Sequence, residues 1–417
     1  MSRWIMPARR PYALPTAAAV GFRLALVSTL VSCSGTDSDV LPDVVVSDSA
    51  GVSVVRVSPL GSFAVPEWTV ERVFSTSNVG GSPVELFQVA DAVLQGDSAL
   101  VIANAGSYEL IFIDWRAGSV SRVGGQGDGP GEFGYLRRLL PHPSGDLVAF
   151  DYRLSRFDAA GRFLSTRRLD AENRLVSLRP LAVFEDGTTV TVLDEQRLFQ
   201  TEGERRDTVP LMVFRPGTSA PDTIGTWLGL ERAFASVAGG KLIVPIGFAR
   251  TTFAASNGRV VAIGSTDSLD ITVYSESLEP TLRVIAARER RIPSARAVDR
   301  WLDRVLDNIP TDAPDARRAW SEAPIRESYP GFDGLILDNH DRLWIGEYPE
   351  PGADSRRWIV FSSDGRPEGQ VHLPLLPANR LPGVTEILTV TDNQVVLLRK
   401  NRFDEETVEV WQVGPSR

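Results

Sequence analysis

Short runs of alternating apolar and polar residues, separated by tight-turn residues, recur along most of this chain and constrain its fold more than any other feature. One such unit reads Ser144-Gly-Asp-Leu-Val-Ala-Phe150, and a related unit reads Asp341-Arg-Leu-Trp-Ile-Gly346. Runs of this length bounded by Gly, Asp, Asn or Ser are typical of β-strands joined by tight turns. The chain is therefore expected to be all-β and to consist of copies of one unit.

Six copies of this unit can be followed from about residue 66 to the end of the chain. They are marked by the turn before each second strand, at Asp97, Gly145, Gly187, Gly258, Asp341 and Asn393. Three of the five separations lie near the period of about 40–50 residues that is typical of propeller blades, and the two longer ones contain insertions. The sequence predicts a six-bladed β-propeller over residues 66–417.

The last copy has one strand fewer than the fullest copies. In propellers the missing strand commonly comes from the other terminus, which removes two exposed sheet edges. The alternating run Trp68–Ser75 is a spare strand that precedes the first copy. We expect it to complete the last blade.

The longest insertion, residues 288–330, is predicted to carry one helix, from Pro293 to Asn308. Its apolar residues recur at helical spacing and form one stripe, made of Ala297, Val298, Trp301, Leu302, Val305 and Leu306. Ile309-Pro310 ends the pattern. A second insertion, Leu242–Phe248, is expected to form an additional hairpin-like element.

The first 32 residues look like a bacterial lipoprotein signal peptide. A basic start and an apolar run over Leu24–Val31 precede Cys33, the only cysteine of the chain. A cysteine at this position is the residue that such a leader would have lipidated. An ordinary signal peptide or a short anchor with an incidental cysteine is the alternative. Residues 33–65 are predicted to be a tether that contains one weak hairpin.

The leader, the phrase from Gly125 to Phe133 and the repeated units resemble the bacterial six-bladed β-propeller lipoproteins, whose repeats are similar to NHL-type propellers. The resemblance covers about residues 66–415. It implies an envelope protein that is anchored to a membrane through Cys33. Ser34 resembles the signal that sorts lipoproteins to the outer membrane, facing the periplasm. The resemblance implies no particular activity, and its departures are the insertion at Pro293–Pro330 and an irregular third repeat.

The charge balance argues against nucleic acid as a partner. The formal net charge of the chain is -9. Because residues 1–32 contain four arginines and no acidic residue, the rest of the chain is more acidic than this total. Phosphate contacts need clustered Lys and Arg, which an acidic body does not offer. The expected partner, besides the membrane, is an unidentified protein or small-molecule ligand.

The glycine-rich phrase is the nearest approach to a phosphate-binding motif, but no helix follows it and no Lys-Ser/Thr pair closes it. We expect Glu132 to hydrogen-bond nearby backbone N–H groups and Phe133 to pack where two blades meet. His142 and His340 are expected in exposed turns, and His372 in an outer strand. No metal-ligand spacing, nucleophile elbow, Walker loop or dinucleotide fingerprint is present, so neither a cofactor nor catalytic or metal-binding residues are predicted.

Two classes of function remain open. The first is a non-catalytic binding or scaffolding propeller at the cell envelope. The second is a metal-dependent propeller enzyme, similar to lactonases or lyases, with its site at the central channel. The second class needs several carboxylates that converge at the channel mouth. The weak candidates at strand ends are Asp114, Asp151, Asp267 and Glu347. Taken singly, each is more simply a solvated turn carboxylate, and the binding role is favoured.

Overall fold

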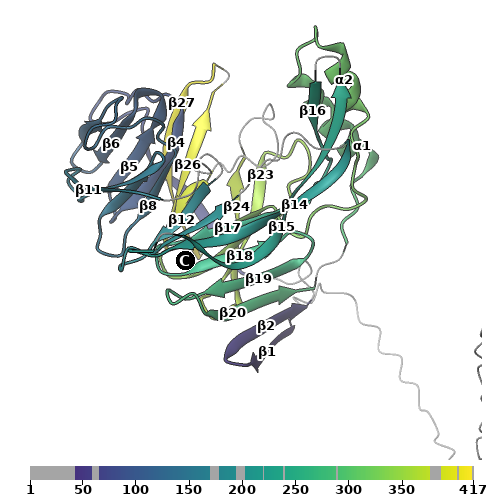
Figure 1. Cartoon of the computed structure of the whole chain (residues 1–417), viewed down its shortest axis with the longest axis horizontal. Coiled ribbons are helices and arrows are strands. Elements are labelled where there is room, and N and C mark those ends of the chain that lie inside the picture. Colours follow the sequence, from purple (N-terminus) through teal and green to yellow (C-terminus); the bar gives the residue numbers. More distant parts are fainter. Residues whose placement is uncertain are drawn as a thin grey trace, which may run out of the picture. The chain divides into compact units, whose positions relative to one another are not determined.

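Antiparallel β-sheets dominate the computed structural model, which describes residues 43–58, 65–169, 178–193, 202–218, 220–237, 240–287, 290–375, 387–401 and 403–415 (Figure 1). In this part of the chain, all the strands belong to six sheets. Each sheet contains at least three strands that follow one another along the chain. The prediction of a mostly β protein is therefore confirmed.

Sheets 1, 2 and 3 take the chain from residue 89 to residue 245. Sheet 1 contains β4 (Val89–Gln95), β5 (Ala99–Asn104), β6 (Glu109–Asp114) and β7 (Ser119–Gly124), with the short 3-10 helix η1 (Ala105–Ser107) after β5. Sheet 2 contains β8 (Arg138–Pro141), β9 (Leu147–Phe150), β10 (Arg153–Phe157) and β11 (Phe163–Arg168). Sheet 3 contains β12 (Leu178–Val183), β13 (Thr189–Leu193), β14 (Gly203–Phe214), β15 (Asp222–Val237) and β16 (Gly240–Pro245). The expected extra element at Leu242–Phe248 thus supplies β16, the fifth strand of sheet 3.

Sheets 4, 5 and 6 complete the set, and two of them include strands from the N-terminal part of the chain. Sheet 4 contains β17 (Thr252–Ser256), β18 (Val261–Ser265), β19 (Leu269–Tyr274) and β20 (Pro280–Ala286), extended by β1 (Asp43–Ser49) and β2 (Val52–Ser58). Sheet 5 contains β21 (Gly334–Leu337), β22 (Leu343–Gly346), β23 (Ser355–Phe361) and β24 (Pro367–Pro374). Sheet 6 contains β25 (Ile387–Val390), β26 (Gln394–Lys400), β27 (Glu406–Pro415) and β3 (Trp68–Ser75).

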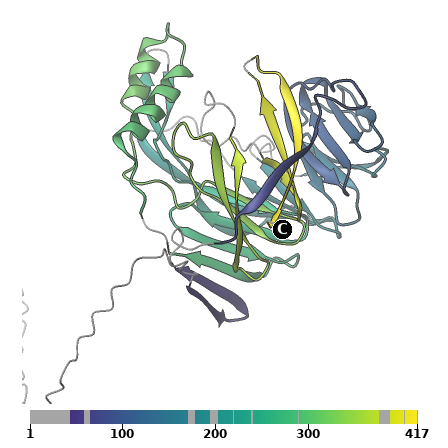
Figure 2. The same cartoon turned by 180° about the vertical axis from the view of Figure 1, so that it is seen from behind.

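The spare strand pairs where the sequence predicted. β3 runs antiparallel to β27 (Figure 2). In this pairing Trp68 lies opposite Pro415 and Ser75 lies opposite Glu409. The weak hairpin expected in the tether also forms, as β1 and β2. Its second strand pairs in parallel with β20, and Val55 and Val57 are buried. Part of residues 33–65 therefore extends sheet 4.

Many strands of the sheets are buried on both faces, which explains their almost continuous apolar runs. In β5, Val101 packs with residues of sheet 2, whereas its neighbour Ile102 packs with residues of sheet 6. Successive side chains of a strand point to opposite faces, so one strand serves two interfaces. In the described residues, such clusters join sheets 1 and 2, 2 and 3, 3 and 4, 4 and 5, 5 and 6, and 6 and 1. The first strands β4, β8, β12, β17, β21 and β25 contact one another in the same order, and β25 contacts β4.

The recurring turn residues adopt positive φ, a backbone conformation that the tight turns between the strands require. Gly145, Gly187, Gly258 and Asp341, each before or in the turn to a second strand, have φ of +87°, +83°, +90° and +61°. Glycine adopts positive φ at little cost, and Asp tolerates it better than most residues. At Gly258 a Cβ would also lie 2.9 Å from the backbone oxygen of Pro141. The repeated phrase is therefore a signature of turn geometry.

The insertion between β20 and β21 contains two helices, so the prediction of a single helix is wrong. Helix α1 (Ala295–Asp307) lies within the predicted range, and the Ser294 side chain caps it by accepting a hydrogen bond from the Ala297 N–H. Helix α2 (Pro314–Ser321) was not predicted, because it has too few apolar residues for a helical stripe. It packs against β15 and β16 (Figure 1). Trp320 Nε1 donates a hydrogen bond to the Ile243 carbonyl at 3.1 Å.

The glycine-rich loop behaves as predicted. Glu132 accepts a hydrogen bond from the Gly129 N–H at 2.8 Å, and Phe133 is buried between sheets 1 and 2. The exposed position predicted for His142 is wrong, because this side chain is buried and its Nδ1 lies 2.8 Å from Ser144 Oγ. Its burial lowers the pKa of the imidazole. His340 and His372 are exposed, as expected.

Candidate functional site

A cavity of about 620 Å³ lies where the helical insertion meets sheets 3, 4 and 5. β15, β16 and the segment after β16 form one wall, and α1 and α2 form another. Thr251 and Asp333, which directly precede the first strands β17 and β21, contribute to the remaining side together with Tyr348. Such a volume is in the range of small-molecule binding sites.

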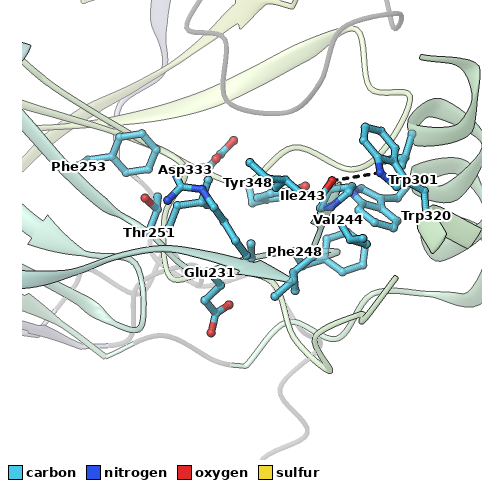
Figure 3. Close-up of a pocket in the computed structure, with 16 residues that line it drawn as sticks. Glu231, Ile243, Val244, Phe248, Thr251, Phe253, Trp301, Trp320, Asp333 and Tyr348 are labelled. Atoms are coloured by element: carbon cyan, nitrogen blue, oxygen red, sulfur yellow. Dashed lines mark hydrogen bonds between the residues drawn. The ribbon is translucent and has the colours of Figure 1, made fainter. Parts of the chain in front are cut away.

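The cavity has an aromatic end and a polar end. In Figure 3, Trp301 and Trp320 lie toward one end, Thr251 and Asp333 lie toward the other, and Tyr348 lies between them. Most of the other lining side chains are aliphatic or aromatic. An apolar cavity with a few converging polar groups is the usual form of a site for an organic ligand.

The aromatic side chains around Tyr348 are packed against one another. The Tyr348 ring stacks on Tyr329, with centroids 5.1 Å apart, and meets Phe248 edge to face at 5.7 Å. Phe248 also contacts Trp301, with the centroids 6.3 Å apart. Arg291 fixes the backbone of this corner by donating from Nη1 to the Tyr348 carbonyl at 3.1 Å. These contacts hold the wall of the cavity in one arrangement.

Two polar groups of the wall make no hydrogen bond within the described residues. They are the hydroxyl of Tyr348 and the indole N–H of Trp301, whose residues are 7% and 3% exposed as a whole. Neither of these two atoms is itself fully buried. Tyr348 and Trp301 are thus available to a ligand in the cavity.

The polar end contains an ion pair. Asp333 Oδ2 lies 3.0 Å from Arg356 Nη2, and Arg356 Nη1 donates to the Asp333 carbonyl at 3.1 Å. Burial raises the pKa of Asp333 to about 6, although the Arg356 guanidinium acts in the opposite direction. The Thr251 hydroxyl, which lies near Asp333 in Figure 3, makes no hydrogen bond within the described residues.

The other charged residues of the wall have partners of their own. Glu231 Oε2 accepts from Arg326 Nε at 3.0 Å and from the Arg250 backbone N–H at 2.7 Å, and Figure 3 shows its carboxylate directed away from the cavity. Arg232 is buried and also interacts within the protein. Within the described residues, no ionised group of the wall is therefore without a partner in the protein.

A second cavity, of about 450 Å³, contains one of the predicted site residues, Asp267. Asp267 Oδ1 accepts a hydrogen bond from Arg206 Nη1 at 2.8 Å. Partial burial acts to raise the pKa of Asp267, but hydrogen bonds from Arg206 and Ser265 outweigh it, so this pKa is lowered. Arg250 and Arg291 also line this cavity. Arg250 donates to the carbonyl and hydroxyl oxygens of Ser328, so its side chain is held by the protein.

The other predicted carboxylates are separate and have local partners. Asp151 accepts from the Gly134 N–H at 3.0 Å and from Arg153 Nη2 at 2.8 Å. Glu347 pairs with Arg357 at 3.1 Å. These two residues and Asp267 follow the second strands β9, β22 and β18, whereas Asp114 ends the third strand β6, at the opposite end of its sheet.

Asp114 accepts hydrogen bonds from the backbone N–H groups of Arg116 and Ala117, which lower its pKa. Among the described residues, no group of three or more His, Cys, Asp or Glu side chains is placed to hold a metal ion. None of the four predicted residues lines the 620 Å³ cavity.

Sequence reasoning identified only part of this site. Trp301 belongs to the predicted apolar stripe of α1, but its role in a cavity wall was not foreseen. Tyr348 and Asp333 were missed. A usable signal was that Asp333 directly precedes β21 and that Tyr348 follows the end of β22 by two residues.

Cys33 and the leader lie outside the described residues. Within the part of the chain that is described, no helix has the length and apolar character needed to cross a membrane.

Comparisons with known proteins give no family assignment. No protein-family model matches the chain, and no curated protein matches it. Among solved structures, a member of the DUF4221 family from Bacteroides vulgatus is 11% identical, with a TM-score of 0.49 over 85% of this chain and 100% of that chain. A protein from Bacteroides fragilis described as exported is 13% identical, with a TM-score of 0.45 over 84% of this chain and 96% of that chain. Streptogramin B lyase is 9% identical, with a TM-score of 0.39 over 83% and 98%.

Proposed function

We propose that this protein is a non-catalytic, ligand-binding β-propeller of the cell envelope, which holds a small organic molecule in the 620 Å³ cavity. The observation that carries the proposal is the aromatic wall of this cavity, in which the polar groups of Tyr348 and Trp301 make no hydrogen bond within the described residues. An apolar cavity with a few converging polar groups is the usual form of a site for an organic ligand. A ligand in the cavity could hydrogen-bond to both groups.

The proposed architecture is a six-bladed ring. It is supported by the cyclic order of contacts among the first strands and by the six clusters between successive sheets. The pairing of β3 with β27 gives the last blade its fourth strand. In this arrangement the helical insertion covers the blade face on which β17 and β21 begin, and the cavity lies beneath it.

A binding role is favoured over metal-dependent catalysis by the donor set of the cavity. Calcium needs about six to eight oxygen ligands. The two carboxylates of the wall are Asp333, which is paired with Arg356, and Glu231, which faces away and is paired with Arg326. The remaining wall suits an organic molecule.

The proposed location is the periplasmic face of the outer membrane, with lipid on Cys33. The test is fractionation of cells that express the full chain. Wild-type protein should sediment with membranes, and Cys33→Ala should be released or remain unprocessed, whereas Ser38→Ala should behave as wild type. Unchanged membrane attachment of Cys33→Ala would remove the lipid anchor from the proposal.

The binding role can be tested by titration with Nile red, an uncharged dye that fluoresces more strongly in apolar surroundings. We expect saturable, one-to-one binding. Ala249→Trp, which places an indole in the cavity, should weaken binding at least 10-fold, while Asp299→Ala on the exposed face of α1 should have no effect. Absence of saturable binding, or equal binding by Ala249→Trp, would refute the proposal.

A further inference from the structure

We infer that the ligand of the 620 Å³ cavity is an uncharged, largely apolar molecule with a carbonyl oxygen that accepts a hydrogen bond from Tyr348. This inference rests on the proposed function and adds the chemical class of the ligand. Three features of the wall carry it: the hydroxyl of Tyr348, the indole N–H of Trp301 and the pairing of the charged groups.

Tyr348 can act as a donor at any physiological pH. Burial raises the pKa of its phenol, and the nearby Asp333 carboxylate acts in the same direction. The hydroxyl therefore stays protonated. In Figure 3 the side chain lies in the middle of the cavity, between the polar and the aromatic ends. A ligand oxygen there would meet a neutral O–H donor.

The neighbouring Tyr329 shows that this corner of the protein can satisfy a tyrosine. Its ring stacks on Tyr348, but its hydroxyl donates to Glu350 Oε2 at 2.7 Å. Of these two tyrosines, Tyr348 lines the 620 Å³ cavity and Tyr329 does not. Within the described residues, the hydroxyl of Tyr348 has no hydrogen-bond partner, whereas that of Tyr329 has one. The difference distinguishes a structural tyrosine from one that faces a ligand.

Trp301 supports an acceptor on the ligand. An indole N–H can only donate a hydrogen bond. Trp301 is 3% exposed, lines the cavity and has no hydrogen-bond partner in the described part of the chain. In contrast, Trp320 of the same wall donates to the Ile243 carbonyl. Two unused donors among apolar side chains call for oxygen acceptors rather than N–H or ammonium groups.

The charged groups indicate a neutral ligand. Asp333 is paired with Arg356 and Glu231 with Arg326, and Arg232 has an interaction of its own within the protein. A charged ligand would find no unpaired counter-ion in the wall of this mostly apolar cavity. Burying such an uncompensated charge is costly. A ketone or a similar neutral carbonyl compound incurs no such cost.

The experiment compares three probes that share one ring system: fluorene, 9-fluorenone and fluorene-9-carboxylate. Each displaces Nile red from the wild-type protein and from two variants, Tyr348→Phe and Tyr329→Phe. Both substitutions remove one hydroxyl and keep the ring. For the wild type, 9-fluorenone should bind about 5-fold more tightly than fluorene, the factor expected for one net hydrogen bond. The carboxylate should bind most weakly.

Tyr348→Phe should abolish the preference for 9-fluorenone and leave the affinity for fluorene unchanged. Tyr329→Phe should keep the preference, although it loses the hydrogen bond to Glu350. Equal binding of fluorene and 9-fluorenone by the wild type, an unchanged preference in Tyr348→Phe, or tightest binding of the carboxylate would each overturn this inference while leaving the binding role intact. If Nile red itself does not bind, both proposals fail.

Discussion

The indole of Trp68 meets the indole of Trp344 edge to face, with the ring centroids 5.7 Å apart and the planes at 77°. Trp68 begins β3, the strand that completes sheet 6, and Trp344 lies in the second strand of sheet 5. Both side chains are buried in the cluster that joins these sheets. The contact therefore ties the early strand to two sheets formed by the last part of the chain.

Removal of β3 tests this closure. Deleting Trp68–Ser75 exposes the edge of β27, so aggregation or loss of cooperative thermal unfolding is expected. Trp68→Ala should lower the free energy of unfolding by about 3–5 kcal/mol, because a large buried side chain is lost. Val73→Ala, at a side chain that is 45% exposed, is the matched control and should have little effect. Unaltered melting of the deletion variant would show that β3 does not close the sheet system.

Helix α1 is expected to contribute stability through its apolar face. Trp301 and Val305 pack with Phe248, Tyr329 and Tyr348. Changing Trp301 and Leu302 to Ser should therefore reduce the free energy of unfolding by roughly 3–5 kcal/mol, measured by chemical denaturation. Asp299→Ser, on the exposed face of the helix, is the control. Equal stability of the double variant would mean that the helix is not held by this cluster.

The glycine-rich loop is expected to be a structural turn. Because Glu132 binds the Gly129 N–H, Glu132→Ala should cost about 0.5–1.5 kcal/mol. Asp128, whose side chain is 96% exposed, should tolerate Ala with little change. Millimolar calcium should not raise the melting temperature of the wild type. A saturable rise that either substitution abolishes would instead support the metal-dependent enzyme, since a ligand of the folded state stabilises it.

Asp333 makes the stability depend on pH in a defined direction. Its pKa is about 6 in the folded protein, above the ordinary value of 3.8. Between these two pH values the folded state holds a proton that the unfolded state has lost. The contribution of Asp333 to the free energy of unfolding is therefore fully present below about pH 4, and it is lost as the pH rises to about 6. The difference between the two pKa values corresponds to roughly 3 kcal/mol.

Asp333→Asn removes this ionisation and keeps an oxygen for Arg356. Relative to the wild type, the variant should gain stability as the pH is raised from about 4 to about 6, as measured by denaturant unfolding at each pH. A stability difference that is constant over this interval, or that changes in the opposite direction, would contradict the assignment to Asp333.

Local sequence pattern was sufficient to predict most of the strands, although β15, the longest, and the first half of β14 were not predicted. The period of two, the left-handed turn residues such as Gly145 and the capped stripe of α1 are all properties of neighbouring residues. The spare strand Trp68–Ser75 could also be found, because an alternating run with no partner of its own has to pair elsewhere. Helix α2 escaped prediction, since its stability comes from packing on β15 and β16 and not from its own pattern.

The candidate site was decided by tertiary structure. Whether a polar group is unpaired depends on which residues surround it, and those of Tyr348 come from the segment after β16, from α1 and from the segment before β21. The same applies to His142, whose sequence context indicates an exposed turn but whose neighbours bury it. Strand and turn preferences act over a few adjacent residues and are readable in the sequence. Burial, charge pairing and cavity shape arise from side chains that only the packing of separate sheets brings together.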